Sequence, residues 1–169
     1  MRTEPQRRTS PPHIDIQTQS ALWDKQPLAA QIVHEAIAAA ASAHSTVGGE
    51  VSIVLTDDST IRALNREWRG IDKPTNVLSF PASGQITGED GRLLGDIVIA
   101  YETLERECDD ESRIFLHHLA HLAVHGFLHL IGYDHQTDSQ AEEMEGLESK
   151  NMKHLNMPDP YLLRDLGDA

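Results

Sequence analysis

A cluster of histidines in the C-terminal third of the chain constrains the fold more than any other feature. The run His125-Gly-Phe-Leu-His129-Leu-Ile-Gly132-Tyr-Asp-His135 holds two histidines four residues apart, then a glycine, then a third histidine. On a helix, residues with this spacing lie about 6 Å apart along the axis and share one face. Gly132 can adopt the left-handed conformation that ends a helix, so that the chain turns back. The three imidazoles are therefore predicted to converge.

Three imidazoles around an open fourth position are typical of a catalytic zinc site. We therefore predict that His125, His129 and His135 are metal ligands and that the chain binds one Zn²⁺. The spacing matches the metzincin protease pattern at each ligand and at the glycine. In those proteases a glutamate follows the first histidine and acts as the general base, whereas this chain has Gly126 there. The motif predicts a metal-dependent hydrolase and argues against a peptidase.

Charge is distributed unevenly along the chain. The net charge of -13 speaks against a nonspecific nucleic-acid binder. Nevertheless, four of the 14 basic residues fall within a short stretch: Arg62, Arg66, Arg69 and Lys73. One interpretation is a solvated helix face whose long side chains cover apolar surface. Beside a metal site in an acidic protein, a local anion-binding patch is the preferred interpretation.

Length and composition limit the classes of protein to which the chain can belong. The 169 residues suit one domain with its own core. No apolar run approaches the ~20 residues that a bilayer span needs, so no membrane association is expected. The polar N-terminus is not expected to be a secretory signal. Cys108 is the only cysteine, which excludes an internal disulfide and favours a cytoplasmic location.

The hydrophobic pattern predicts an α+β fold, an α/β sandwich in which a mixed sheet of about four strands carries helices on its faces. The helix with the metal-binding histidines is expected at its centre. Strands are expected at 13–18, 50–56, 76–80 and 93–100, with a loop at 82–92. Helices are expected at 28–44, after Asp57 and Asp58, at 101–108, after Ser112 into the histidine motif, and at 139–155. The helix after Asp58 is expected to carry Ile61, Leu64 and Trp68.

We divide the chain into three parts. A flexible N-terminal extension is expected at residues 1–12, where prolines and polar residues prevail. Residues 13–157 are expected to form the single catalytic domain. A C-terminal tail follows at 158–169.

Three motifs carry a resemblance to a known family. The histidine run, Asp72-Lys-Pro-Thr-Asn-Val-Leu-Ser-Phe80 and Leu94-Gly-Asp-Ile97 resemble the YbeY family of bacterial rRNA maturation factors, over roughly residues 13–157. The resemblance implies a zinc-dependent, single-strand-specific endoribonuclease. It implies action in 16S rRNA 3′-end maturation and in 70S ribosome quality control. The implied partners are rRNA, small ribosomal subunit proteins and an Era-type GTPase. By position, the family's zinc ligands fall on His125, His129 and His135, and its functionally important arginine falls on Arg69.

Phosphodiester hydrolysis requires positive charge where negative charge develops, and two residues besides the ligands are predicted to contribute to catalysis. Arg69 can clamp phosphate oxygens bidentately; the alternative is a structural pair with Asp72 or Asp96. His121, one turn before His125, is a candidate proton shuttle or substrate contact, with a packed histidine as the alternative. The catalytic set is therefore Arg69, His125 and His121. Either a water on the metal or the 2′-OH of the RNA can be the nucleophile.

Substrate contacts are predicted from the basic stretch and from the motif after it. They comprise Arg66, Arg69, Lys73, Asn76 and Ser79. Asn76 can instead cap the turn before its strand. Asp134 can orient a ligand histidine or serve its turn.

Two other functions compete with the nuclease. One is a ribosome-assembly factor in which the metal is structural, and its support is the acidic charge and the lack of an evident general base. The other is a metalloprotease, which Gly126 weakens.

Overall fold

The computed structural model describes residues 10–46, 48–82, 86–87 and 91–162. Four strands form an open mixed sheet in the order β1 (His13–Thr18), β2 (Glu50–Thr56), β5 (Gly91–Ala100) and β3 (Val77–Pro81). The first three are parallel, and β3 runs antiparallel to β5. A short strand, β4 (Ile86–Thr87), pairs with the start of β5. The predicted mixed sheet is confirmed.

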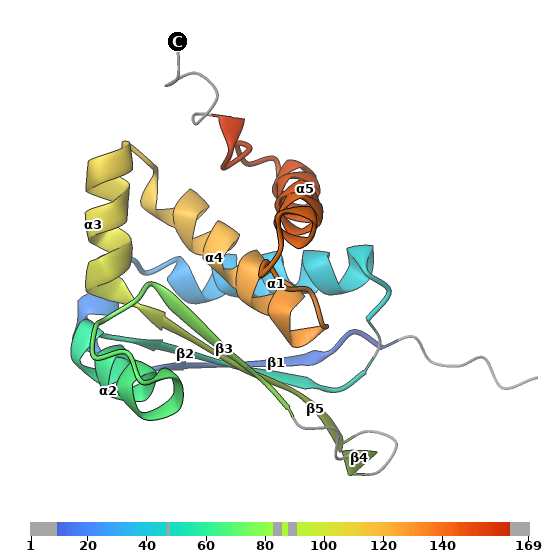
Figure 1. The fold of residues 1–169 in the computed structure, drawn as a ribbon, viewed down its shortest axis with the longest axis horizontal. Coiled ribbons are helices and arrows are strands. Elements are labelled where there is room, and N and C mark those ends of the chain that lie inside the picture. The colour runs from blue at the N-terminus through green and yellow to red at the C-terminus, as the bar shows by residue number, and fades with distance from the viewer. Residues whose placement is uncertain (1–9, 47, 83–85, 88–90, 163–169) are drawn as a thin grey trace, which may run out of the picture.

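Helices cover both faces of this sheet (Figure 1). They are η1 (Ala21–Lys25), α1 (Ala29–Ala43), α2 (Asp58–Arg69), α3 (Tyr101–Glu111), α4 (Phe115–Leu130) and α5 (Asp138–His154). Helices α1 and α4 pack together on one face, α2 lies on the other, and α5 packs on α4 and α1. The α+β class is therefore confirmed, and the histidine-bearing helix α4 lies between the sheet and α5.

Strand β5 presents apolar side chains to both faces of the sheet, so both faces must be covered by helices. Side chains alternate between the faces of a strand, so Ile97 and Ile99 enter the main core with α1 and α4. Val98 and Ala100 enter a smaller core on the face that α2 covers. A strand covered on both faces has few polar positions, which explains its nearly continuous apolar sequence.

Both ends of helix α2 are capped, the first by Asp57 as expected. The Asp57 side chain accepts a hydrogen bond from the Thr60 backbone N–H at 2.9 Å, as an N-cap does. Gly70 ends the helix with φ at +71°, a left-handed conformation that glycine adopts without strain. Asp57 thus fixes the start of α2, and Gly70 fixes its end directly after Arg69.

Two local expectations differ from the structure. Ser112 does not begin α4; it ends α3 in a left-handed conformation, because α3 continues to Glu111 and uses Ser112 as its last cap. Within the expected loop 82–92, Ile86–Thr87 pairs with β5, while residues 83–85 and 88–90 lie outside the described residues. Trp68, in the last turn of the expected helix α2, is 67% exposed, whereas Ile61 is buried.

The structure describes only part of the expected N-terminal extension and of the expected C-terminal tail. Residues 1–9 of the expected extension and 163–169 of the expected tail lie outside the described residues.

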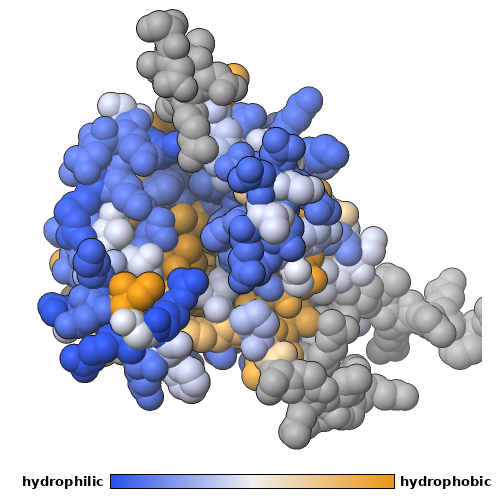
Figure 2. All heavy atoms as spheres, in the orientation of Figure 1, coloured by the Kyte–Doolittle hydropathy of each residue, from blue (hydrophilic) through white to orange (hydrophobic). Residues whose placement is uncertain are grey.

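Within the described ranges, the helices lack the length and apolar character needed to cross a bilayer. On the face shown in Figure 2, hydrophilic residues cover most of the surface and hydrophobic residues show mainly between its two flanks.

Candidate active site

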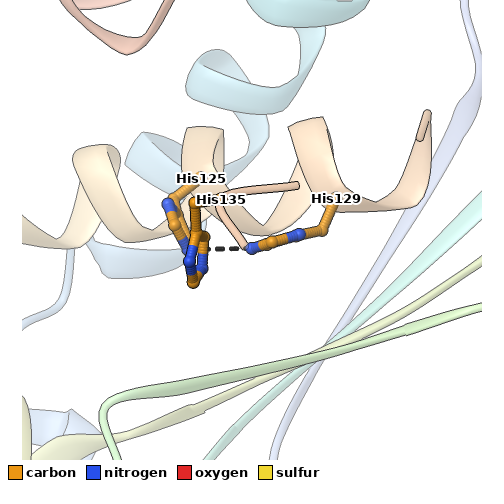
Figure 3. Close-up of side chains that lie close together, drawn as sticks. All are labelled: His125, His129 and His135. Carbon is orange, nitrogen blue, oxygen red and sulfur yellow. Dashed lines mark hydrogen bonds between the residues drawn. The ribbon is translucent and has the colours of Figure 1, made fainter. Parts of the chain in front are cut away.

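Three histidines converge beside the sheet. His125 and His129 project from one face of α4, and His135 returns from the turn that follows it (Figure 3). One ring nitrogen from each lies within 4.8 Å of the others. The turn depends on Gly132, whose φ of +108° suits glycine alone among the common residues. The convergence predicted from the spacing is thus present in the structure.

Hydrogen bonds orient two of the rings. His129 donates from Nδ1 to the Tyr133 carbonyl oxygen at 2.9 Å, and His125 donates from Nδ1 to the Glu148 carboxylate. A carbonyl and a carboxylate only accept, so the Nε2 atom of each neutral ring carries a lone pair. These two Nε2 atoms face each other at 3.1 Å (dashed in Figure 3). A cation between them would turn this repulsive contact into shared coordination, so the donor set fits a metal ion.

The ionisation of His129 also suits a metal ligand. Burial lowers its pKa, and the neighbouring His125 and His135 lower it further. Its imidazole is therefore held neutral at physiological pH, which is the form that binds a metal. His135 is exposed and lies at the open side of the triad.

Glu148 is a residue of this centre that the sequence analysis missed. It lies on α5, is 1% exposed, and accepts hydrogen bonds from the His125 ring and the Tyr161 hydroxyl. Its carboxylate also lies 3.5 Å from Nε2 of His121. Burial raises the pKa of Glu148, but hydrogen bonds from His121 and His125 outweigh burial and hold it at about 2. The available signal was its position on the inner face of α5, four residues from both Met144 and Met152, where a carboxylate needs a partner.

A cleft of about 560 Å³ opens onto the triad. Strand β3 forms one wall with Asn76 before it and Ser79 within it, and the three histidines form the opposite wall. The end of α2 contributes Trp68 and Arg69 to the rim. The predicted metal ligands and the predicted arginine therefore face a common space.

Arg69 is available to a ligand in this cleft. Its side chain is exposed, and no ion pair or hydrogen bond joins it to another of the described residues. The carboxylate of Asp72, one of its alternative partners, instead accepts from Arg62 at 2.9 Å. A guanidinium without a carboxylate partner beside three converging imidazoles suits a site that binds an anion.

Comparison with known proteins identifies the family. The family model described as "Endoribonuclease YbeY" matches residues 13–156. The chain belongs to the YbeY family. Its relatives named "Endoribonuclease YbeY" include one from Bradyrhizobium sp. BTAi1, 55% identical over 93% of this chain and 96% of its own length. Another, from Nitrobacter winogradskyi, is 54% identical over 91% of this chain and 84% of its own length.

The fold also resembles a solved structure. The solution structure of TM1509 from Thermotoga maritima aligns with a TM-score of 0.50 and 23% identity, over 87% of this chain and 97% of that one. At this identity the likeness supports the fold alone. Membership in the YbeY family confirms the resemblance carried by the three motifs, and with it the prediction of an endoribonuclease.

Of the other predicted site residues of this YbeY-family chain, two line the cleft and two lie outside its lining. Asn76 lines the cleft, but its amide donates to Glu107 at 2.9 Å and its oxygen accepts from the Val77 N–H at 2.7 Å. Ser79 lines the cleft, whereas Arg66 and Lys73 are exposed outside its lining. Their roles as substrate contacts stay predictions.

His121 lies behind the triad rather than in the cleft. Its Nε2 is 3.4 Å from the Tyr161 hydroxyl and 3.5 Å from Glu148, and its Nδ1 is buried with no hydrogen-bond partner among the described residues. Its catalytic role stays a prediction. Asp134 accepts from the His135 backbone N–H at 2.8 Å, so its hydrogen bond holds the turn.

Gly126 faces the sheet, which explains the departure from the metzincin pattern in this YbeY-family chain. A Cβ at this position would lie 2.9 Å from the Ile97 Cγ2 and 3.2 Å from the Ser79 Oγ. The glutamate of a metzincin would therefore point into packed strands rather than toward the metal centre. The close approach of α4 to the strands brings Ser79 and the histidines to one cleft.

The Gly126→Ala variant is expected to lower the free energy of unfolding by about 1–3 kcal/mol, because the branched Ile97 side chain cannot move aside without repacking. Chemical denaturation measures the change. Gly146→Ala is the matched control: Gly146 lies on α5 with open space around it. Alanine there is expected to stabilise by about 0.5–1 kcal/mol through helix propensity. Equal effects in the two variants would contradict the packing argument.

Proposed function

We propose that the chain is a zinc-dependent endoribonuclease that cleaves single-stranded RNA, acting in 16S rRNA 3′-end maturation and in 70S ribosome quality control in the cytoplasm. The main support is the meeting of three ring nitrogens, within 4.8 Å of one another, in one cleft with Arg69, which pairs with no other described residue. The names of relatives more than half identical to the chain support the reaction class.

The residues of the cleft have separate tasks in this proposal. His125, His129 and His135 would hold the zinc ion, which supplies a Lewis acid for the charge that develops on a phosphate oxygen. Arg69 donates two parallel hydrogen bonds to the other phosphate oxygens and so orients the scissile group. Glu148 and the Tyr133 carbonyl fix the ring orientation of His125 and His129, so that the ligands need no rearrangement when substrate arrives.

The position of the triad favours an unpaired strand. The histidines lie in the wall of a cleft between α4 and β3 rather than on a protruding surface. A single strand can bend a phosphate into such a cleft, whereas a duplex holds its phosphates on a stiff helix and hides its bases. The partners proposed besides rRNA are small ribosomal subunit proteins and an Era-type GTPase. The net charge of -13 suits contact with basic ribosomal proteins.

A ribosome-assembly factor with a structural metal is the second candidate. The observation that favours it is the connection of the triad to the rest of the fold: His125 is hydrogen-bonded to Glu148 of α5, and Glu148 to Tyr161. A metal at the triad would therefore stabilise the packing of α5 on α4, with or without catalysis.

Cleavage assays on three matched substrates test the proposed function. Protein of verified metal content is incubated with an end-labelled single-stranded RNA, the same RNA annealed to its complement, and DNA of the same sequence. We expect cleavage of the single-stranded RNA only, loss of cleavage with a chelator, and its return with zinc. The His129→Ala variant, which lacks one ligand, is expected to stay inactive after zinc addition. If the wild type cleaves none of the substrates while zinc raises its melting temperature, the assembly factor becomes the better explanation.

A further inference from the structure

Trp68 is an exposed aromatic side chain at the rim of the cleft. The chain has two tryptophans, and they differ sharply: Trp23 is 3% exposed in the main core, whereas Trp68 is 67% exposed. Trp68 lines the same cleft as the histidine triad and immediately precedes Arg69. Water contact with so large an apolar ring is unfavourable, so an exposed tryptophan in a binding cleft indicates a surface that a ligand covers.

The ring of Trp68 is supported from one side. It meets Phe80 of β3 edge to face, with the centroids 6.1 Å apart and the planes at 62°. Such a contact restricts rotation of the indole without covering it. Phe80 also lines the cleft. The two rings therefore form a fixed aromatic corner between the end of α2 and the strand that faces the triad.

The charge around this corner selects among possible ligands. Arg66, Arg69 and Lys73 are exposed near the end of α2. The carboxylates around them are Glu67 on the last turn of α2, Asp72, which pairs with Arg62, and Asp134 in the lining of the cleft. An aromatic platform beside exposed cations matches a chain of alternating bases and phosphates. A purely apolar partner would leave these cations unpaired, so it fits the corner less well.

We propose that Trp68 is a stacking platform for one nucleobase of a single RNA strand whose neighbouring phosphate lies at Arg69 and the triad. This inference rests on the proposed function and adds a base-binding subsite to it. Stacking on an indole is tolerant of sequence, because every base presents a π-face. It requires a base that has left its own helix, so the platform would contribute to the preference for single strands.

The two tryptophans allow a direct test. In Trp23→Phe protein, Trp68 is the only tryptophan and therefore the only indole fluorophore. We expect a single-stranded 2′-O-methyl oligonucleotide, checked for integrity after the titration, to quench its emission saturably. The same oligonucleotide in a duplex is expected to cause little quenching. Absence of quenching while the oligonucleotide binds by anisotropy would overturn the proposal.

Variants separate stacking from mere apolar contact. Trp68→Leu is expected to weaken binding of the oligonucleotide about five- to 150-fold, the range for loss of one stacked base. Trp68→Phe retains a flat ring and is expected to restore most of that affinity. The control is Leu28→Ala, at an exposed leucine before α1 that lies outside the cleft, and its binding should match wild type. Circular dichroism checks that each variant is folded.

The outcomes also distinguish this inference from the function on which it rests. If wild-type protein cleaves RNA but Trp68→Leu binds and cleaves normally, the platform is wrong and the nuclease stands. If the wild type cleaves no RNA yet the oligonucleotide quenches Trp68 and Trp68→Leu weakens binding, the nuclease proposal fails and the subsite stands as an RNA contact. Equal weakening in Trp68→Phe and Trp68→Leu would also overturn stacking.

Discussion

Replacement of Arg69 by alanine is expected to slow RNA cleavage by about 10²–10³-fold, the usual cost of removing one group that stabilises transition-state charge. The guanidinium is exposed in the cleft and bonded to no other described residue, so its loss leaves no carboxylate unpaired. The fold and the metal site should therefore be preserved. Single-turnover cleavage rates measure the effect, and metal analysis of the same sample confirms that zinc is retained.

Two further variants sharpen this prediction. Arg62→Ala removes another exposed arginine from the same helix, but one that pairs with Asp72 outside the cleft. Its cleavage rate should stay close to that of wild type. Arg69→Lys keeps the charge and loses the bidentate geometry, so an intermediate rate is expected. If Arg69→Ala cleaves as fast as wild type, either the chemistry does not use this arginine or the activity belongs to a contaminant.

Replacement of Glu148 by alanine is expected to weaken zinc binding by about 10–100-fold, the usual consequence of removing the partner that orients a ligand histidine. The carboxylate holds Nδ1 of His125 as a donor and thereby aims Nε2 at the other ligands. Because its pKa is held at about 2, Glu148 stays ionised across the neutral range, and this contribution is lost only as the pH falls toward that value. Competition with a chromophoric chelator measures the affinity.

Because Glu148 is buried, matched variants are needed to separate an effect on zinc binding from an effect on folding. Glu143→Ala removes an exposed carboxylate from the same helix and should leave zinc affinity unchanged. Tyr161→Phe removes only the hydroxyl that donates to Glu148, and a smaller loss of affinity is expected while folding is preserved. Unchanged zinc affinity in both Glu148→Ala and Tyr161→Phe would show that the triad does not depend on this carboxylate.

The cleft brings the histidine triad, Trp68 and Arg69 together from separate elements of the fold. Strand β3 runs antiparallel at the edge of the sheet, next to β5, and the absence of a Cβ at Gly126 lets α4 approach both strands closely. The cap at Gly70 ends α2 so that Trp68 and Arg69 reach the same space. Residues of α2, β3 and the histidine motif thus meet through two glycines and an edge strand.

Local patterns in the sequence were sufficient for most of the architecture. The alternation in β1 and β2, the apolar run of β5 and the caps of α2 depend on residues within a few positions of one another. The convergence of His125, His129 and His135 is likewise local, because a helical turn and one glycine produce it. Ser112 shows the limit of such patterns, since a serine between two helices can end the first or begin the second.

Tertiary structure alone decided the surroundings of the triad. Glu148 meets His125 only because α5 packs against α4, and Gly126 has no room for a Cβ only because β5 and β3 lie beneath it. Trp68 has helical spacing that suits a core position, yet the end of α2 leaves it open to the cleft. The sequence by itself determined which residues could bind a metal, because backbone geometry sets distances along one segment. It did not determine which residues orient those ligands or face the substrate, because these contacts join segments whose separation in space depends on the packing of the whole chain.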